Sequence, residues 1–416
     1  MSVAIHSFIK TPQVMKHIIV VHYAEIAIKG NNRKYFEKQL VTNIKRALPS
    51  GVYSQIRRLR GRIVIFLNSD FDAANFVKPL QSVFGVSHFS LGCIVEKQLS
   101  LINDEAWRQI SQIKFDSFCV RTKRAYKQFS ITSVEMNRQV GSHLFDKCAK
   151  RVDLSTPDVT VYIEIVELGA LIYTQKISGA KGMPVGVSER AVSLLSSGID
   201  SPVASYLMLK RGIDLIYVHF HSQPYTNIAS QENTERIVKV LAQSQYYSKI
   251  YFVPFVDIQK EIMAHASAEL RVLLYRRYMI RLAEQIGIKE CCRALVTGES
   301  VGQVASQTLS NIQAVSQIAR LPILRPLCGA DKEEIVQQAR KIGTYEISTE
   351  PYEDCCSLFV PDNPATKVHP DRLNSAERNL DMEALLTAAF EQTVFKEIRY
   401  SRDRGESIFL SEEVGK

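Results

Sequence analysis

The sequence contains no apolar stretch that approaches the ~18 consecutive residues needed for a transmembrane helix. Residues 1–23 also lack the basic start, apolar block and small-residue cleavage site of a secretory leader. These two absences argue against a membrane protein and against an exported one. We therefore expect a cytoplasmic protein.

Three further patterns are missing. None of the eight cysteines forms a C-x-x-C pair, which argues against a structural zinc site, and cytoplasmic thiols should stay reduced. No Gly-Lys-Ser or Gly-Lys-Thr triplet occurs, which excludes a Walker-type phosphate loop. No internal repeat is present, which argues against a repeat architecture.

Basic residues are present in excess, and the excess is uneven. Residues 1–190 hold 27 Lys and Arg against 15 Asp and Glu, a net charge of +12. The remainder holds 25 against 28, a net charge of −3. This distribution is expected if the first half binds a polyanion such as nucleic acid and the second half carries out chemistry. A solvated basic surface is the alternative.

The first half of the chain predicts two small α+β domains, at residues 1–75 and 76–178. Strands are expected at 17–22 and 62–67, and a helix between them, with apolar positions in helical spacing from Phe36 to Leu48. In the second domain we expect a hairpin that turns at Leu168-Gly169. Residues 179–190, rich in glycine, are expected to form a linker.

The second half of the chain predicts an α/β domain at residues 191–395. Five apolar segments, each followed by a helical segment, are expected to be strands. They are residues 191–195, 213–220, 249–255, 294–298 and 321–327. This alternation is typical of a doubly wound parallel sheet, whose ligand crevice lies at the carboxyl ends of the strands. Long helices are expected across 257–286 and from 298 to about 319, and residues 396–416 as a polar C-terminal tail.

The segment after the first of these strands has the composition of an anion-binding loop. In Leu194-Leu195-Ser196-Ser197-Gly198-Ile199-Asp200-Ser201-Pro202, Ser201 is expected to cap the following helix, with Pro202 at the first helical position. The free N–H groups of the helix start and the serine hydroxyls would bind a phosphate. Asp200 offers a carboxylate for Mg²⁺ that accompanies such a phosphate.

The Ser-x-Gly-x-Asp-Ser pattern resembles the PP-loop of ATP pyrophosphatases. Longer strings, among them SSGIDSPVASYLMLKRG, VHFHSQPYT, LVTGESVGQVASQTLSNI and DKEEIVQQARKIGTYEIS, resemble the tRNA 4-thiouridine synthetase family. YAEIAIKGNNRKYFEKQL resembles its ferredoxin-like domain, and VRTKRAYKQFSITSVEMNRQVG resembles a THUMP domain. The resemblance spans about residues 17–370. Two positions depart from the family's usual glycines, Ser197 in the loop and Glu189 in the linker.

The resemblance implies an ATP site. Arg276 would meet a phosphate, His219 and Phe220 the adenine, and Gly298 and Gln307 would close the pocket. With the loop, the predicted ATP-binding residues are Leu194, Leu195, Ser196, Ser197, Gly198, Asp200, Ser201, His219, Phe220, Arg276, Gly298 and Gln307. The basic residues predicted to bind tRNA in the first two domains are Lys29, Arg33, Lys34, Arg121, Lys123, Arg124 and Lys127.

The segment PYEDCCS matches the family's catalytic cysteine segment. Cys355, beside Cys356, is implied to carry sulfur as a persulfide. Cys93, Cys119, Cys148 and Cys328 are expected to be small core residues. Fewer than 50 residues follow position 370, too few for the rhodanese domain of some members. A cysteine desulfurase is therefore the expected sulfur donor.

The resemblance implies that ATP adenylates O4 of a tRNA uridine, the one at position eight, and that sulfur then replaces this oxygen. The resemblance also implies sulfur supply to a thiamine-pathway carrier protein. Two alternatives stay open. The first is a tRNA-binding protein whose adenylation is impaired by Ser197. The second is a serine hydrolase with Gly298-Glu299-Ser300-Val301-Gly302 as nucleophile elbow and His369 as base.

Overall fold

The computed structural model describes residues 16–68, 72, 74–351, 353 and 364–414. It divides into two compact units, residues 1–182 and 183–416, which are considered separately below. Within the described residues, no helix is both long and apolar enough to cross a membrane. The same residues hold no cluster of three or more His, Cys, Asp or Glu side chains arranged to bind a metal ion.

The first unit is built on one nine-stranded sheet in the order β2-β3-β1-β4-β8-β7-β5-β6, with β9 paired to β4. Its elements are β1 (Lys16–His22), α1 (Arg33–Ala47), β2 (Tyr53–Leu59), β3 (Arg62–Leu67), α2 (Ala74–Ser82), β4 (His88–Val95), α3 (Leu99–Ile110), β5 (Ser117–Arg124), α4 (Ser133–Cys148), β6 (Arg151–Val152), β7 (Val159–Val166), β8 (Gly169–Tyr173) and β9 (Ile177–Ser178).

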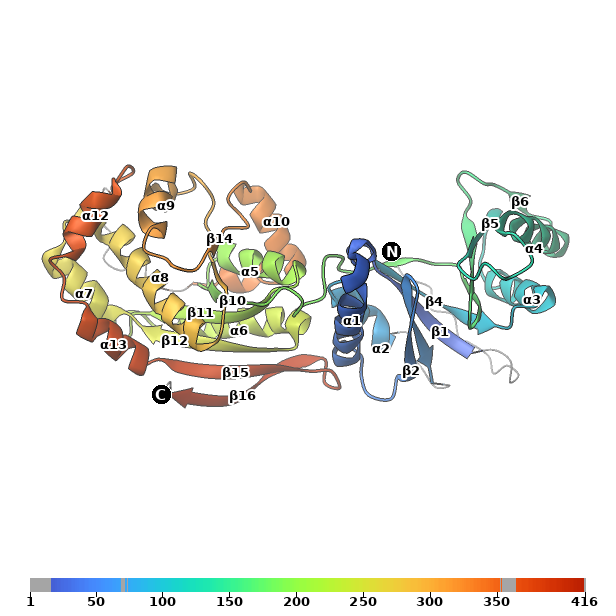
Figure 1. Cartoon of the computed structure of the whole chain (residues 1–416), viewed down its shortest axis with the longest axis horizontal. Helices are drawn as coiled ribbons and strands as arrows, with labels where there is room; N and C mark the ends of the chain where they lie inside the picture. The colour runs from blue at the N-terminus through green and yellow to red at the C-terminus, as the bar shows by residue number, and fades with distance from the viewer. Residues whose placement is uncertain (1–15, 69–71, 73, 352, 354–363, 415–416) are drawn as a thin grey trace. The chain divides into compact units, whose positions relative to one another are not determined.

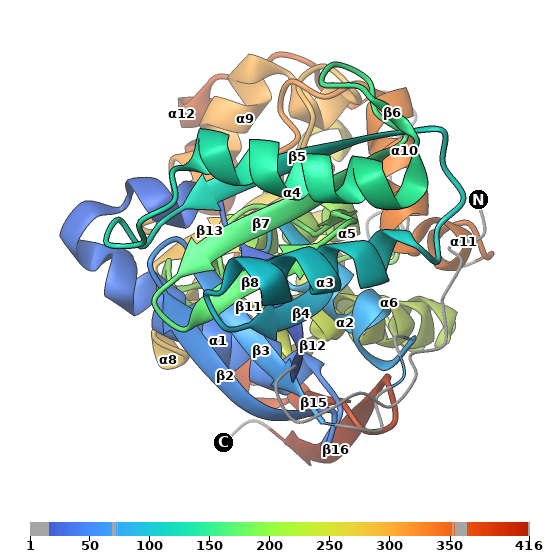
Figure 2. The same cartoon turned by 90° about the vertical axis from the view of Figure 1, so that its right-hand side faces the viewer.

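Burial explains where the strands of this sheet run. Residues 18–21 of β1 are fully buried between β3 and β4. Helices α3 and α4 cover one face of β5, β7 and β8, and Met136 and Ile163 lie in the core between them (Figure 2). The predicted strands at 17–22 and 62–67 are confirmed, and the predicted hairpin is present with its turn at Glu167-Leu168, one residue before the predicted position. The sequence did not predict β2, because its exposed basic segment lacks an apolar stripe.

A buried ionic cluster connects the strands of this sheet. The Glu164 carboxylate on β7 accepts hydrogen bonds from the Tyr173 hydroxyl, at 2.6 Å, from His22 Nε2, at 2.9 Å, and from the buried guanidinium of Arg62. Burial lowers the pKa of His22 to about 3, so the ring is neutral. Residues from β1, β3, β7 and β8 therefore share one carboxylate, which ties the two halves of the sheet together.

The second unit is built on a seven-stranded sheet in the order β14-β13-β10-β11-β12-β15-β16. Its elements are β10 (Arg190–Leu194), α5 (Asp200–Lys210), β11 (Asp214–His221), α6 (Ala229–Gln245), β12 (Tyr247–Pro254), α7 (Val256–His265), α8 (Arg271–Lys289), β13 (Ala294–Val296), α9 (Leu309–Ser316), β14 (Ile323–Leu324), α10 (Lys332–Ile342), α11 (Tyr345–Ser348), α12 (Pro370–Glu377), α13 (Glu383–Glu391), β15 (Val394–Ser401) and β16 (Glu406–Val414).

The five predicted strands of this unit are confirmed as a parallel set, β10 to β14. The helix predicted across 257–286 is wrong in extent, because Ala266 is extended and separates α7 from α8. The helix predicted from 298 to 319 is also too long, since α9 begins only at Leu309 and residues 297–304 form a loop. Within the segment predicted as a tail, β15 and β16 form an antiparallel hairpin paired to β12 (Figure 1).

The strand order places a crevice beside β10. From β10 the chain passes to β11 on one side and, after β12, returns to β13 on the other side. The connections that leave β10 and β13 therefore separate at their carboxyl ends. In open α/β sheets this switch point is where ligands bind.

Candidate nucleotide-binding site

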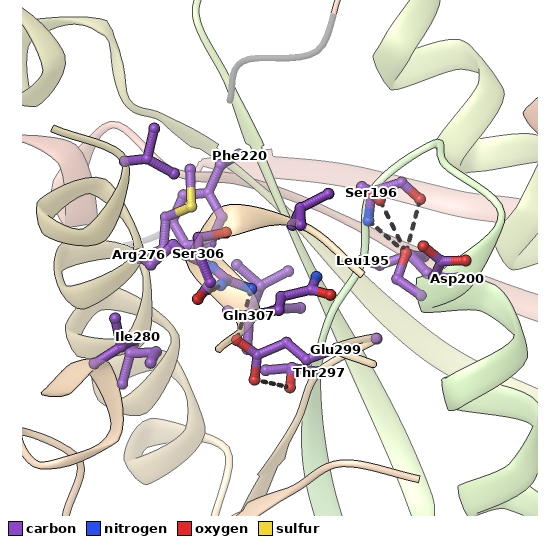
Figure 3. A pocket seen from close by; sticks show the side chains of 18 of the residues that line it. Leu195, Ser196, Asp200, Phe220, Arg276, Ile280, Thr297, Glu299, Ser306 and Gln307 are labelled. Atoms are coloured by element: carbon purple, nitrogen blue, oxygen red, sulfur yellow. Dashed lines mark hydrogen bonds and ion pairs between the residues drawn. The ribbon is translucent and has the colours of Figure 1, made fainter. Parts of the chain in front are cut away.

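A cavity of about 530 Å³ lies at the carboxyl ends of β10, β11 and β13 (Figure 3). Ten of the twelve residues predicted to bind ATP line it, namely Leu194, Leu195, Ser196, Asp200, Ser201, His219, Phe220, Arg276, Gly298 and Gln307. The other two, Ser197 and Gly198, belong to the same loop but do not line the cavity. Their assignment to ATP stays a prediction, but the structure brings distant segments together around one hollow.

Serine hydroxyls close the loop between β10 and α5. The Ser196 N–H donates to Ser201 Oγ, at 2.9 Å, and Ser201 Oγ lies 3.1 Å from the Ser196 carbonyl oxygen. The Gly198 N–H donates to Ser196 Oγ, at 3.3 Å. The prediction that Ser201 caps the helix is wrong, because α5 already begins at Asp200 and the Ser201 side chain reaches back into the loop. The loop is thus held in shape by its own side chains.

Ser197 does not strain the loop. It is buried, its φ is not positive, and its hydroxyl oxygen lies 3.3 Å from Ser230 Oγ on α6. The loop therefore shows no backbone strain at Ser197 that would impair adenylation. The other departure from the family's glycines does carry strain, since Glu189 has a φ of 60°.

Asp200, at the start of α5, contacts two residues that sequence reasoning did not single out. One carboxylate oxygen lies 2.6 Å from Lys332 Nζ, and the other accepts a hydrogen bond from Gln303 Nε2, at 3.0 Å. Lys332 is the first residue of α10, directly after the capping residue Asp331. The segment DKEEI, which contains Lys332, was the sequence feature that could have indicated this residue. A cation and a carboxylate therefore adjoin the loop where phosphates are expected.

Arg276 on α8 is held by a buried carboxylate. Its guanidinium lies 2.6 Å from Glu299 and donates to the Ser306 carbonyl, at 3.0 Å (Figure 3). Glu299 also accepts hydrogen bonds from Arg325 and from the Thr297 hydroxyl. Burial alone would raise the pKa of Glu299, but the two guanidinium groups hold it below its ordinary value. Glu299 is therefore ionised and fixes Arg276 at the cavity wall.

His219 is buried and neutral. Burial lowers its pKa to about 4, although the hydrogen bond to the Leu195 carbonyl partly opposes that change. Nδ1 lies 2.9 Å from this carbonyl oxygen, and Nε2 lies 3.2 Å from Ser230 Oγ. Both ring nitrogens thus have partners in the protein. A nucleobase would meet the face of the ring rather than a nitrogen atom.

The wall of the cavity away from the loop is mainly apolar, as Figure 3 shows around Ile280. Its apolar side chains are Val272, Met279, Ile280, Val304 and Val315. Gln307 faces this wall, and its buried Oε1 has no hydrogen-bond partner among the described residues. An apolar slot with one unused acceptor suits a flat base that carries an amino group.

Gly298 is a glycine because α5 approaches it closely. A Cβ at this position would lie 2.7 Å from the Ser201 nitrogen and 2.9 Å from the Asp200 carbonyl carbon. Both atoms are backbone atoms of the first turn of α5, so neither can move aside by rotating. The end of β13 and the start of α5 can therefore pack together only if residue 298 has no side chain.

The predicted catalytic cysteines Cys355 and Cys356 lie outside the described residues. Glu353 and Pro364 are the nearest described residues before and after them. The Glu353 carboxylate accepts a hydrogen bond from the Asn227 N–H, at 2.9 Å, and Pro364 lines the cavity. Of these two flanking residues, Pro364 is the one at the cavity.

The prediction that four other cysteines are core residues holds only in part. Cys93 and Cys119 are buried, but Cys148 is half-buried and Cys328 is exposed. Cys328 follows the short strand β14 in a loop, and the apolar composition around it did not reveal that the loop faces solvent. Of two further, adjacent cysteines, Cys291 is exposed and Cys292 is buried.

Two of the basic residues predicted to bind tRNA line one hollow of the first unit, and the others do not line it. Arg33 and Lys34 line a hollow of about 690 Å³ together with three arginines of the β2–β3 hairpin that were not predicted, Arg57, Arg58 and Arg60. Lys29 lies over the Phe36 ring, and Arg121, Lys123 and Lys127 belong to β5 and the loop after it. Arg124 instead donates to the carbonyls of Phe129 and Ile131, at 2.7 and 3.3 Å, and supports its own loop.

The serine hydrolase alternative does not fit the structure. The Ser300 side chain is buried, and its hydroxyl donates to the Ala330 carbonyl, at 2.8 Å. His369 caps α12 and lies 3.2 Å from Asp371 instead of activating a serine. No catalytic triad can form from these groups.

Comparison with known proteins matches three segments of the chain. Residues 18–90 match the ThiI ferredoxin-like domain, 95–175 the THUMP domain, and 186–382 the thiamine biosynthesis protein (ThiI) family. A probable tRNA sulfurtransferase of Moorella thermoacetica is 41% identical over 374 residues, which cover 90% of this chain and 95% of that protein. The chain belongs to the tRNA sulfurtransferase family.

Other members of the tRNA sulfurtransferase family support this assignment. The probable tRNA sulfurtransferase of Acetivibrio thermocellus is 40% identical over 389 residues, covering 91% of this chain and 98% of that protein. A crystal structure of a 4-thiouridine synthetase–RNA complex with bound ATP is 34% identical, with a TM-score of 0.84, over 92% of this chain and 99% of that one. Helix α13 and the β15–β16 hairpin lie beyond the last matched residue, 382.

Proposed function

We propose that this chain is an ATP-dependent enzyme that converts a tRNA uridine, at position eight, to 4-thiouridine. The observation that carries the proposal is the phosphate loop of residues 194–201, which opens with Arg276 and Gln307 onto one cavity at the switch point of the sheet. The similar 4-thiouridine synthetase that binds ATP and RNA supports the same activity.

The first half-reaction is adenylation. The loop and the N-terminus of α5 would hold the phosphates of ATP, and Lys332 and Arg276 would offset the negative charge that develops as pyrophosphate leaves. Uridine O4 attacks the α-phosphorus, and the bond to the pyrophosphate oxygen breaks. Where Mg²⁺ accompanies ATP, Asp200 is the carboxylate beside the loop that would hold it. The apolar slot and the acceptor of Gln307 would hold the adenine.

The second half-reaction is sulfur transfer. The terminal sulfur of a persulfide on Cys355 attacks C4 of the uracil, and AMP leaves with the former O4. A second thiol then cleaves the sulfur–sulfur bond to Cys355, which frees 4-thiouridine and leaves a disulfide for an external thiol to reduce. Glu353, two residues before Cys355 in the sequence, accepts a hydrogen bond from the Asn227 N–H.

The first unit would hold the tRNA. Its net positive charge and the hollow lined by Arg33, Lys34 and the hairpin arginines suit phosphate contacts, which give affinity without base readout. A cysteine desulfurase would load Cys355 with sulfur, and the same persulfide would serve a thiamine-pathway sulfur-carrier protein. In this scheme the ferredoxin-like and THUMP segments bind, and the PP-loop segment reacts.

Mass spectrometry of nucleosides from tRNA incubated with the protein, ATP and a sulfur source tests the proposal. We expect 4-thiouridine to form with release of AMP and pyrophosphate. Absence of the thionucleoside with an active sulfur donor would refute the proposed activity.

The two cysteines separate the half-reactions. Cys355→Ser should still release pyrophosphate in the presence of tRNA but make no 4-thiouridine, because serine cannot carry a persulfide. Cys356→Ser, the matched control, should keep at least part of the thiolation. The reverse pattern would assign the sulfur to Cys356, and thiolation by the double variant would overturn the persulfide mechanism.

A further inference from the structure

The turn after β11 exposes an aromatic ring from a rigid backbone. Tyr225 is 51% exposed, whereas Ser222 and Thr226 in the same turn are buried. The Tyr225 N–H donates to the Ser222 carbonyl, at 2.8 Å, and the Thr226 N–H reaches the same oxygen, at 3.2 Å. The Ser222 hydroxyl in turn donates to the Gln259 side chain on α7. The ring is therefore held outward by a turn that is itself fixed.

Hydrogen bonds connect this turn and the start of α6 to Glu353 and to the phosphate loop. The Asn227 N–H, two residues after Tyr225, donates to Glu353, two residues before Cys355. On the other side the turn leads into α6, whose Ser230 hydroxyl contacts Ser197 of the phosphate loop, at 3.3 Å. Tyr225 thus projects from the segment that links the phosphate loop to the start of the cysteine segment.

A cation accompanies the ring. Lys260 Nζ lies 5.1 Å from the centroid of Tyr225 and 3.2 Å from a carboxylate oxygen of Asp257. A ring beside an ammonium group suits a nucleotide, because the base can stack on the ring while its phosphate meets the cation.

The proposed reaction requires such a platform. C4 of the target uracil must be reached by the persulfide and O4 by the α-phosphate, so the base must leave its stack in the RNA. A base turned out of its stack regains stacking energy on an aromatic side chain. Phe220 cannot serve, because it is buried and packs edge-on against Phe255, with 5.4 Å between centroids. Among the described residues of the second unit, Tyr225 is the one exposed large aromatic side chain.

We propose that Tyr225 is the platform on which the target uracil stacks. This inference rests on the proposed function, since it names where the substrate base of that reaction lies. Tyr225 then selects for a base presented out of its stack, while the bulk of the tRNA affinity comes from the first unit.

Substitution of the ring tests the platform. Tyr225→Ala should lower AMP formation on saturating tRNA by 10- to 100-fold and leave the affinities for ATP and tRNA within twofold of the original values. Tyr225→Phe should stay within threefold, because the stacking face is kept. Ile228→Ala is the matched control, since Ile228 is 55% exposed three residues away but is not aromatic, and it should have no effect.

A fluorescence probe reports stacking directly. The chain has a single tryptophan, Trp107, so Tyr225→Trp in a Trp107→Phe background places the only indole at the platform. Its emission should be quenched by tRNA and not by tRNA abasic at the target position. Equal quenching by both RNAs, or full AMP formation by Tyr225→Ala, would overturn the platform. Loss of tRNA affinity in Tyr225→Ala would also overturn it and make Tyr225 a general RNA contact. In each case the original protein would still make 4-thiouridine, whereas failure of the proposed function would remove that product.

Discussion

The charged residues at the candidate binding surfaces of the two units differ in exposure and pairing. In the first unit the cations of the β2–β3 hairpin, Arg57, Arg58 and Arg60, point into a wide hollow and are exposed. In the second unit the charges at the cavity are paired and largely withdrawn from water, as Arg276 and Arg325 are on Glu299. Exposed cations suit a long polyanion held at many points, whereas paired and buried charges suit one small ligand held at fixed atoms.

Buried charge does occur in the first unit, but away from its basic hollow. Glu164, Arg62 and His22 lie inside the sheet and connect strands. Their role is architectural, because their hydrogen bonds join strands of the sheet. The contrast between the units therefore lies in their candidate binding surfaces. The exposed cations of the first unit can adapt to a ligand, whereas the paired charges of the second are preorganised. The predictions below test it in order of decreasing effect.

The sharpest test removes the carboxylate at the phosphate loop. Asp200→Ala should lower AMP formation by about 100-fold or more, as preorganised polar groups at reacting centres typically contribute. It should leave tRNA affinity unchanged, because Asp200 belongs to the second unit. Parallel assays of AMP release and of filter binding measure both. Weakened tRNA binding with normal AMP release would contradict the division between the units.

Acid should weaken the second unit through His219. Its pKa of about 4 lies below the ordinary 6.5, so the unfolded chain binds the proton first as the pH falls. The neutral His219 ring contributes fully to the free energy of unfolding above pH 6.5. This contribution, at most about 3 kcal/mol, is lost as the pH falls towards 4. Denaturant unfolding at pH 7.5 and 4.5 measures it. His219→Asn should flatten this dependence, and the exposed His369→Asn should not; equal slopes in all three proteins would reject the assignment.

Close packing at Gly298 should make the site intolerant of one methyl group. Gly298→Ala should cost about 1–3 kcal/mol of stability and weaken ATP binding, because the new Cβ meets the backbone of α5. Gly329→Ala is the control, since a Cβ there has no neighbour within 4 Å. Calorimetric titration with ATP and thermal unfolding compare the two. Similar behaviour of both variants would show that the cavity is not preorganised at this point.

The arginines that line the hollow of the first unit should contribute additively to tRNA affinity. Removing Arg57, Arg58 and Arg60 together should weaken tRNA binding roughly tenfold and reduce the slope of log K against log salt by about 2, or 0.7–0.9 per lost phosphate contact. A matched triple variant of exposed cations in the second unit, Arg293, Lys341 and Arg378, should leave the slope unchanged. If both triples flatten the slope alike, RNA is held by the whole surface.

The smallest effect is expected at Glu189. Glu189→Gly relieves a left-handed backbone at φ 60° but adds freedom to the unfolded chain. These contributions have opposite signs, so the net change should be below about 1 kcal/mol, with activity retained. Thermal unfolding measures it. A loss well above that value would show that the exposed ion pair with Arg293, at 3.7 Å, matters more than the strain.

Local sequence patterns predicted the strands and the phosphate loop. They did not predict features that depend on contacts between residues far apart in the sequence. The parallel strands were visible because buried strands are apolar runs, and the phosphate loop was visible because serine, glycine and aspartate cluster there. Lys332 was missed, since its contact with Asp200 spans 132 residues. Cys328 was misjudged because local composition does not tell which side of a loop meets solvent. The backbone at Ser197 likewise required coordinates, because serine alone does not fix φ.

The hairpin β15–β16 has a consequence for how copies of this protein meet one another. Without it, β12 would end the sheet with unpaired backbone groups along an apolar strand, the kind of border on which another chain can add itself. Phe395 also covers Tyr251, with 5.3 Å between their ring centroids. The new edge strand is β16, on which Glu406 and Glu413 are exposed. Two such acidic edge strands repel each other. The hairpin therefore replaces an edge to which another chain could add a strand with an edge that resists this pairing.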